Sequence, residues 1–336
     1  MSVEDIAVVG AGSYGSCLAM LFGRAGHRVS LWARNADTAA VMEETREAQA
    51  YLPGHKLPDT IKVTADLESA VRGKRFIVGV TPSHGTRDVL GRAAQWLDPD
   101  AIVINASKGL EDGTLMTIDR MYGEIFPTRI AERATYLSGP TFATEIAAGL
   151  PAAIVLAGHD ESTTLAAQEA LTTLHFRIYR TDDVVGVLIG GALKNVVAIG
   201  AGVSDGLGFG SNTRVALMTR GLAEITRIGV ALGANPLTFA GLSGMGDLVL
   251  TCSGDASRNR RVGLALGQGK KMPDILGEMR QVAEGVKTAK VAKELTGKMG
   301  VEAPIIDAMY AIIHEGRPVR DAITMLLSRP ARSERD

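Results

Sequence analysis

The feature that most constrains the fold is a glycine-rich segment close to the N-terminus. Residues 6–9 (IAVV) form an apolar run typical of a buried strand, and Gly10, Gly12 and Gly15 follow at once in a G-x-G-x-x-G spacing, ahead of an apolar helical stretch. In this order the glycines permit a tight turn, let a pyrophosphate approach the backbone, and allow the helix to pack closely on the strand. The alternative is a turn without a ligand. We predict a dinucleotide site, because the helix N-terminus adds free N–H groups and a positive dipole end.

The first half of the chain alternates short apolar runs with longer amphipathic stretches, and the second half has mostly helical patterns. This order predicts an α/β fold: an N-terminal Rossmann-type doubly wound sheet of parallel strands (residues 1–185), a C-terminal mostly α-helical substrate and catalytic domain (186–330), and a charged tail (331–336). The 336 residues suffice for two domains. The predicted strands are 6–9, 29–32, 76–80, 101–105, 135–137 and 153–156, and the predicted helices are 184–203, 213–232, 258–266, 288–295 and 303–313.

Composition excludes several functional classes. A formal net charge of −1 with 4% aromatic residues argues against a dedicated nucleic-acid binder. Cys17 and Cys252 lie far apart, and the histidines have no ligand spacing, so we expect neither a disulfide framework nor a metal site. The acidic N-terminus lacks an export signal, which predicts a cytoplasmic protein. Residues 184–204 are apolar enough to suggest a membrane span, but the central Lys194 makes membrane insertion unfavourable.

Arg34 bears on the choice of cofactor, because it follows the second predicted strand about twenty residues beyond the glycines. An NAD site usually has an acidic residue there for the ribose 2′-hydroxyl, whereas an arginine accommodates the 2′-phosphate of NADP. Asp37 lies slightly further on and would permit some use of NAD, and a solvated surface arginine is the alternative reading. We predict that NADP(H) is preferred and that NAD(H) is possible.

Lys194 is the only ionisable residue within 184–204. A lysine on so apolar a helix loses hydration, which lowers its pKa unless a carboxylate is near, and it then becomes able to exchange a proton. The alternative is a lysine that extends from the helix surface into solvent. Gly190 and Gly191 precede it and would let another group approach the helix. Lys194 is therefore a candidate acid and base.

Other polar residues lie close to predicted element ends. Asp247 follows a glycine-rich turn, so its carboxylate either orients a lysine or caps a helix. Ser257, Arg258 and Asn259 offer a hydroxyl, a guanidinium and an amide that suit a small phosphate, although such a basic run is often a solvated helix face. Lys108 comes just after the fourth predicted strand, at the carboxyl edge of the sheet where a cofactor and a substrate would meet.

Taken together, these segments resemble the bacterial-type NAD(P)-dependent glycerol-3-phosphate dehydrogenase family. The similarity runs over almost the whole chain in the family's order. The segments that carry it are 10–19 (GAGSYGSCLA), 51–58 (YLPGHKLP), 107–111 (SKGLE), 138–151 (SGPTFATEIAAGLP), 190–210 (GGALKNVVAIGAGVSDGLGFG), 219–224 (TRGLAE), 244–252 (GMGDLVLTC), 257–261 (SRNRR) and 283–285 (AEG).

The resemblance implies the reversible reduction of dihydroxyacetone phosphate to sn-glycerol 3-phosphate, a precursor in phospholipid synthesis, by a homodimer that acts on a small-molecule substrate. It implies that Lys194 is the general acid and base, that Lys108 contacts substrate near the nicotinamide, and that Asp247 orients the reacting groups or holds a substrate hydroxyl. The implied substrate pocket also contains Gly139, Thr141, Ser257, Arg258 and Asn259. The implied dinucleotide contacts are Gly10, Gly12, Ser13, Tyr14, Gly15, Arg34, Lys108, Ala143, Arg258, Val282 and Glu284.

The sequence departs from the family pattern at a few positions. Leu188 stands where the family often has a glutamate, Tyr14 replaces a frequent tryptophan, and Thr81 occupies a position where an apolar residue is commoner. Two other readings remain: a related two-domain reductase of a 3-hydroxy or 2-keto acid, and a catalytically silent NADPH sensor. The phosphate-suited group that includes Arg258 argues against the first, and the joint presence of Lys194 and Asp247 argues against the second.

Overall fold

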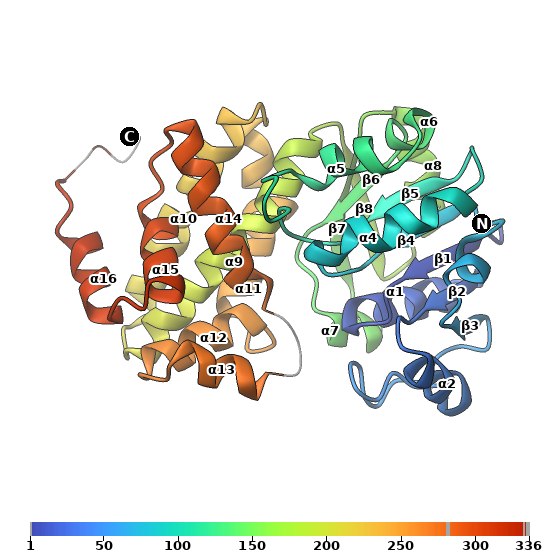
Figure 1. Cartoon of the computed structure of the whole chain (residues 1–336), viewed down its shortest axis with the longest axis horizontal. Helices are drawn as coiled ribbons and strands as arrows, with labels where there is room; N and C mark the ends of the chain where they lie inside the picture. The colour runs from blue at the N-terminus through green and yellow to red at the C-terminus, as the bar shows by residue number, and fades with distance from the viewer. Residues whose placement is uncertain (1, 280–282, 332, 334–336) are drawn as a thin grey trace.

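A computed structural model describes residues 2–279, 283–331 and 333, and it contains a sheet domain followed by a helical domain (Figure 1). The sheet domain is α/β with helices on both faces, and the second domain is built from helices, so the predicted fold class is confirmed. Most of the charged tail predicted for 331–336 lies outside the described residues.

The sheet has eight strands in the order β3-β2-β1-β4-β5-β6-β7-β8. Strands β1 to β6 are parallel, whereas β7 is antiparallel to β6 and β8 runs parallel to β7. The predicted parallel arrangement therefore holds from β1 to β6 and does not extend to β7. An apolar run has the same pattern in either strand direction, so the sequence did not indicate this reversal. The strands are β1 Asp5–Val9, β2 Arg28–Trp32, β3 Ile61–Thr64, β4 Phe76–Gly79, β5 Ile102–Asn105, β6 Thr135–Ser138, β7 Ala152–Gly158 and β8 Phe176–Thr181.

Burial along β1 shows why the sheet needs helices on both faces. Ile6 and Val8 belong to one apolar cluster, and Ala7 and Val9 belong to a second cluster on the opposite face. Side chains alternate along a strand, so a strand that is apolar at every position is buried on both sides. The helices of this domain are α1 Ser13–Arg24, α2 Ala36–Thr45, α3 Leu67–Val71, α4 Ser83–Ala93, α5 Ile118–Ile125, α6 Thr128–Ala131, α7 Ala143–Ala147 and α8 Glu161–Leu171.

Helix α9 (Val184–Gly206) is the core of the helical domain. Its most apolar window has a mean hydropathy of 1.9 and is 94% buried within the protein, which identifies a core helix. The helices that pack on it are α10 Ser211–Ala231, α11 Asp247–Ser253, α12 Arg258–Gly267, α14 Glu284–Met299 and α15 Pro304–His314. Two short helices, α13 Met272–Glu278 and α16 Val319–Leu327, complete the domain. A Cβ on Gly263 of α12 would lie 1.9 Å from the Ile199 carbonyl oxygen, so α9 and α12 pack backbone to backbone.

The two domains share the first turns of α9. Strand β8 ends at Thr181, and the predicted boundary after residue 185 falls within the first turn of this helix. Val184, Val187 and Leu188 pack in an apolar cluster of the sheet domain, whereas the helix from Ile189 onward belongs to the core of the helical domain. The boundary stays a proposal, and α9 is an element that packs in the cores of both domains.

Candidate active site

The glycine-rich loop between β1 and α1 has the geometry that a dinucleotide requires. Gly10 has a φ of +123°, and a Cβ at this position would lie 2.7 Å from the Val80 carbonyl oxygen. A Cβ on Gly15 would lie 1.8 Å from the Gly10 oxygen, whereas a Cβ on Gly12 would meet no described atom within 4 Å. Helix α1 has no acidic residue in its first turn. The loop is therefore compact on its protein side, open at Gly12, and positive at the helix end, which fits a pyrophosphate.

Lys108 lies in the loop that follows β5, at the carboxyl edge of the sheet. Its Nζ donates to the Gly139 carbonyl oxygen at 3.2 Å and to Asp247 Oδ2 at 2.6 Å. Gly139 follows β6, and Asp247 is the first residue of α11 in the other domain. Lys108 thus brings the sheet edge into contact with the helical domain.

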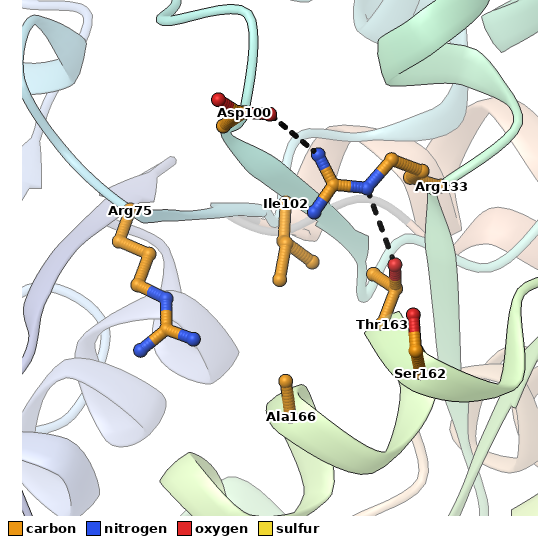
Figure 2. Close-up of a pocket in the computed structure, with 7 residues that line it drawn as sticks. All are labelled: Arg75, Asp100, Ile102, Arg133, Ser162, Thr163 and Ala166. Carbon is orange, nitrogen blue, oxygen red and sulfur yellow. Dashed lines mark hydrogen bonds and ion pairs between the residues drawn. The ribbon is translucent and has the colours of Figure 1, made fainter.

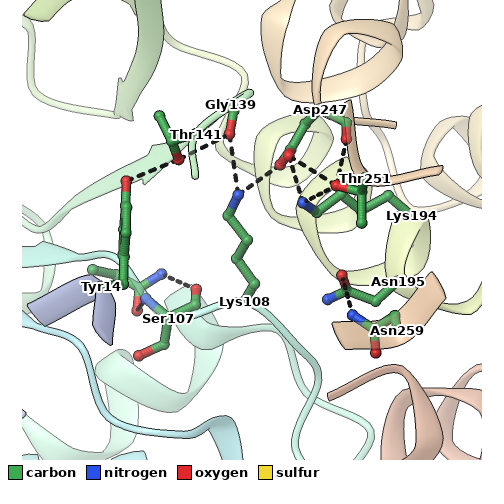
Figure 3. A network of polar contacts seen from close by, with 11 residues as sticks. Tyr14, Ser107, Lys108, Gly139, Thr141, Lys194, Asn195, Asp247, Thr251 and Asn259 are labelled. Atoms are coloured by element: carbon green, nitrogen blue, oxygen red, sulfur yellow. Dashed lines mark hydrogen bonds and ion pairs between the residues drawn. The ribbon is translucent and has the colours of Figure 1, made fainter. Parts of the chain in front are cut away.

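Asp247 joins two lysines (Figure 3). Its Oδ1 accepts a hydrogen bond from Lys194 Nζ, and its Oδ2 accepts the one from Lys108. Asp247 is 1% exposed and Lys194 is 6% exposed, so the Asp247–Lys194 pair is shielded from water. The N-cap residue of α11 is Gly246, so Asp247 does not occupy the cap position, and its carboxylate contacts the two lysines instead. Thr251, one turn further along α11, accepts from Lys194 Nζ at 2.8 Å and donates to the Asp247 carbonyl oxygen at 2.6 Å.

The electrostatics of this cluster suit proton exchange. Burial is the largest influence and lowers the pKa of Lys194 to about 8; Asp247 opposes this effect, and the nearby charge of Lys108 adds to it. A lysine with this pKa populates both protonation states near neutral pH, which an ordinary exposed lysine does not.

Two glycines on α9 allow the close packing around Lys194. A Cβ on Gly190 would lie 2.6 Å from the Ser243 carbonyl oxygen, and a Cβ on Gly191 would lie 2.7 Å from Ser138 Oγ. Ser243 belongs to the π-helical turn Leu242–Gly246 that leads into α11. The expectation that small residues let another group approach the helix is therefore confirmed by the packing.

The Ser257, Arg258 and Asn259 group lies at the start of α12. Ser257 Oγ accepts from the Arg260 backbone N–H and caps this helix. The Asn259 side chain donates to Asn195 Oδ1 at 2.9 Å and accepts from the Gly285 N–H at 2.9 Å, so its amide links α9, α12 and α14. Arg258 is half-buried, and burial lowers its pKa against the opposing charge of Glu284. The three residues have different environments, and none of them is a simply solvated side chain.

The remaining predicted cofactor residues lie around the carboxyl ends of the strands. Glu284 begins α14 and accepts from Ser83 Oγ at 2.9 Å, while Ser13 Oγ donates to the Tyr51 carbonyl oxygen at 2.7 Å. Ala143 begins α7, close to the loop that holds Gly139 and Thr141. Arg34 is exposed after the end of β2. Val282 lies outside the described residues.

Some contacts were not predicted from the sequence. Thr251 has an i, i+4 relation to Asp247, and this spacing on a helix was the available signal. Asn195 is adjacent to Lys194, but its partner Asn259 is 64 positions away. Ser138 Oγ is buried and has no hydrogen-bond partner among the described residues. Nothing in the local sequence distinguishes this serine from any other at the end of a strand.

A separate surface hollow lies at the opposite edge of the sheet, where β5 begins at Ile102 (Figure 2). Its arginines are paired: Arg75 contacts Glu4 at 2.9 Å, and Arg133 contacts Asp100 at 3.3 Å. The hollow has a volume of about 430 Å³ and is lined by Arg75, Asp100, Ile102, Arg133, Ser162, Thr163 and Ala166. It shares no residue with the lysine–carboxylate cluster.

A dinucleotide-type loop beside a buried lysine–carboxylate–lysine cluster defines the class of two-domain NAD(P)-dependent dehydrogenases. The family models for the NAD-dependent glycerol-3-phosphate dehydrogenase N-terminus and C-terminus match residues 5–164 and 183–324. This chain therefore belongs to the NAD-dependent glycerol-3-phosphate dehydrogenase family.

Individual proteins of this family are similar to the chain over almost its full length. The chain is 52% identical over 332 residues to a glycerol-3-phosphate dehydrogenase [NAD(P)+] of Geobacter sulfurreducens, with 99% of each chain covered. It is 51% identical over 331 residues to the protein of that name from Geobacter sp. strain M21, with 98% of this chain and 99% of the relative covered. The crystal structure of glycerol-3-phosphate dehydrogenase from Coxiella burnetii has a TM-score of 0.92 at 36% identity, with 97% and 99% covered. The resemblance inferred from the motifs is confirmed.

Proposed function

We propose that this chain catalyses the reversible reduction of dihydroxyacetone phosphate to sn-glycerol 3-phosphate with a nicotinamide dinucleotide. The observation that carries this proposal is the buried cluster in which Asp247 holds both Lys194 and Lys108. Membership of the dehydrogenase family supplies the reaction, and the cluster supplies the groups that a carbonyl reduction requires.

The dinucleotide supplies the hydride when it is bound. The open Gly12 position and the N-terminus of α1 fit its pyrophosphate, as described above. We assign the rest of its contacts to residues around the same sheet edge. The proposed set is Gly10, Gly12, Ser13, Tyr14, Gly15, Arg34, Lys108, Ala143, Arg258 and Glu284.

Lys194 is assigned the role of general acid and base at the C2 oxygen. During reduction negative charge develops on this oxygen, and the Lys194 ammonium stabilises the charge and donates a proton. During oxidation the neutral amine accepts the hydroxyl proton. Lys108 adds a second positive charge near the same oxygen, and Asp247 keeps both lysines in place.

The substrate phosphate is assigned to the start of α12. Arg258 is the half-buried cation there, and a guanidinium binds phosphate oxygens through paired N–H groups. The side-chain amide of Asn259 is hydrogen-bonded to Asn195 and Gly285. We therefore propose that Asn259 contributes its backbone to the pocket and that its side chain stabilises α9. Ser257, Gly139 and Thr141 complete the proposed pocket.

The pH dependence tests the assignment of Lys194. Since the pKa of Lys194 is about 8, the protonated form needed for reduction is lost as pH rises through that value. We expect kcat/KM for dihydroxyacetone phosphate reduction to fall above about pH 8, and kcat/KM for glycerol 3-phosphate oxidation to fall below it. Initial rates measured in both directions between pH 6 and 10 check this, and a reductive rate that keeps rising to pH 10 contradicts the assignment.

A preference for NADP is part of the proposal. Arg34 is exposed just beyond β2, and the Gly10 N–H donates to the Trp32 carbonyl oxygen at 3.1 Å, which keeps the end of β2 beside the glycine loop. Arg34→Ala is expected to reduce the ratio of kcat/KM with NADPH to that with NADH by about tenfold, because one hydrogen-bonded charge contact is lost. The control Arg28→Ala removes an exposed arginine from the other end of the same strand. An unchanged ratio for Arg34→Ala contradicts the preference.

We also propose a cytoplasmic homodimer whose product supplies phospholipid synthesis. The homodimer and the role in phospholipid synthesis rest on the family resemblance of the motifs. The cytoplasmic location rests on the two cysteines, which lie far apart in the sequence and suggest no disulfide framework. The burial of α9 within the helical domain agrees with a protein that does not insert this segment into a membrane.

A further inference from the structure

The glycine-rich loop and the proposed substrate loop are joined by one long-range contact. Thr141 Oγ1 donates to the Tyr14 hydroxyl at 3.2 Å, and these two residues are 127 positions apart. Tyr14 is the second residue of α1, where we place the dinucleotide, and Thr141 follows β6, where we place the substrate. The contact therefore links two ligand sites.

Further hydrogen bonds connect Thr141 to the cluster formed by Lys108, Asp247 and Lys194 (Figure 3). Thr141 Oγ1 also lies 3.4 Å from the Gly139 carbonyl oxygen, and that oxygen accepts the hydrogen bond from Lys108 Nζ at 3.2 Å. Lys108 in turn contacts Asp247 at 2.6 Å. The single hydroxyl hydrogen of Thr141 is thus shared between Tyr14 and Gly139, and the position of Tyr14 influences how firmly the Gly139 carbonyl is held.

The chemistry of Tyr14 suits a fixed hydrogen-bonding role. Burial raises its pKa, so the phenol stays neutral at the pH of catalysis. Its ring packs against the core of the sheet domain, which limits its rotamers. Within the described residues the hydroxyl has Thr141 as its hydrogen-bond partner. A substitution that keeps the ring and deletes the hydroxyl therefore tests one contact.

We infer that the Tyr14 hydroxyl is a positioning group that couples dinucleotide binding to substrate binding. A dinucleotide on α1 fixes Tyr14, and Tyr14 fixes Thr141 beside the carbonyl that holds Lys108. The second ligand then meets a pocket that is already ordered, and the free-energy coupling is reciprocal. This inference rests on the proposed function, because it takes the two loops as the cofactor and substrate sites.

Equilibrium binding measures this coupling without turnover. The affinity for NADPH is titrated by its fluorescence with and without saturating sn-glycerol 3-phosphate, since two reduced partners do not react. We expect glycerol 3-phosphate to tighten NADPH binding to the wild-type protein by about 5-fold or more. For Tyr14→Phe we expect this factor to fall below about twofold, and for Thr141→Val likewise. The double variant should lose no more than either single variant, because both remove the same contact.

Tyr122→Phe is the matched control, because the Tyr122 hydroxyl is buried and has no partner among the described residues. This control is expected to keep the wild-type coupling. Full coupling in Tyr14→Phe, or no coupling in the wild type, overturns the inference. Turnover of dihydroxyacetone phosphate is measured alongside: its absence in the wild type overturns the proposed function, whereas normal turnover with full coupling in Tyr14→Phe overturns only the coupling role.

Discussion

Lys194→Ala is expected to lower kcat for dihydroxyacetone phosphate reduction by about 10³-fold, within the usual contribution of a positioned general acid. The variant removes the proton donor and one positive charge from the site of the developing oxyanion. Lys108 remains paired with Asp247, so the cluster is not left with an uncompensated carboxylate. Steady-state rates of NADPH oxidation measure the loss.

The same variant should retain NADPH affinity within about threefold, since the charge effect of one lysine outside the pyrophosphate loop is small. Fluorescence titration of NADPH checks this. Lys62→Ala, which removes an exposed lysine from β3, is the control and should leave kcat unchanged. If Lys194→Ala abolished NADPH binding, or kept more than about a tenth of the wild-type kcat, Lys194 would not be the acid and base.

Asp247→Asn is expected to move the pH profile as well as lower the rate. Asp247 raises the pKa of Lys194 against the effects of burial and of Lys108, so its removal lowers that pKa below its value of about 8. The fall in kcat/KM for reduction with rising pH should therefore move to lower pH by about one unit or more. At pH 7.5 we expect kcat to fall by about 10²-fold, because less of Lys194 is protonated and both lysines lose their shared charged partner, keeping only Thr251 and the Gly139 carbonyl.

A structural control separates this effect from a loss of stability. Asp205 also bridges two cations, Arg214 at 3.1 Å and Arg260 at 2.7 Å, outside the lysine cluster. Both Asp205→Asn and Asp247→Asn are expected to lower the midpoint of thermal unfolding, because each removes the carboxylate that pairs with two cations shielded in part or in full from water. Only Asp247→Asn should move the pH profile. A profile that stays in place in Asp247→Asn would assign this carboxylate a structural role alone.

The sheet domain was largely predictable, because its central strands are mostly apolar runs and the glycine spacing is local. The strands β3 and β8 were missed, since they lie at the sheet edges and alternate buried with exposed residues, as Lys62 and Arg177 illustrate. The direction of β7 was also missed. The direction of β7 is set by the connection through α7 and by packing, and the pattern of apolar residues indicates neither of these.

The sequence predicted the individual residues of the candidate site, but it did not predict how they lie relative to one another. The apolar surroundings of Lys194 indicated a low pKa, and the glycines before it indicated close approach, but no pattern placed both lysines on one carboxylate. The sequence allowed Asp247 to contact a lysine or to cap a helix, and the tertiary contacts place its carboxylate against the two lysines. The effect of Leu188, which stands where the family often has a glutamate, was also not predictable from the sequence. Leu188 packs in an apolar cluster of the sheet domain, and the polar contacts of Lys194 are made by Asp247 and Thr251.

The most direct test of the proposed function is the rate of NADPH oxidation with dihydroxyacetone phosphate, measured by absorbance and compared with the rate with unphosphorylated dihydroxyacetone. The proposed function predicts rapid turnover of the phosphate ester and a kcat/KM at least about 10²-fold lower for dihydroxyacetone, because the contacts assigned to Arg258 are lost. Parallel assays with NADH give the cofactor ratio. Binding of NADPH without turnover of dihydroxyacetone phosphate, or equal turnover of the two ketones, would contradict it.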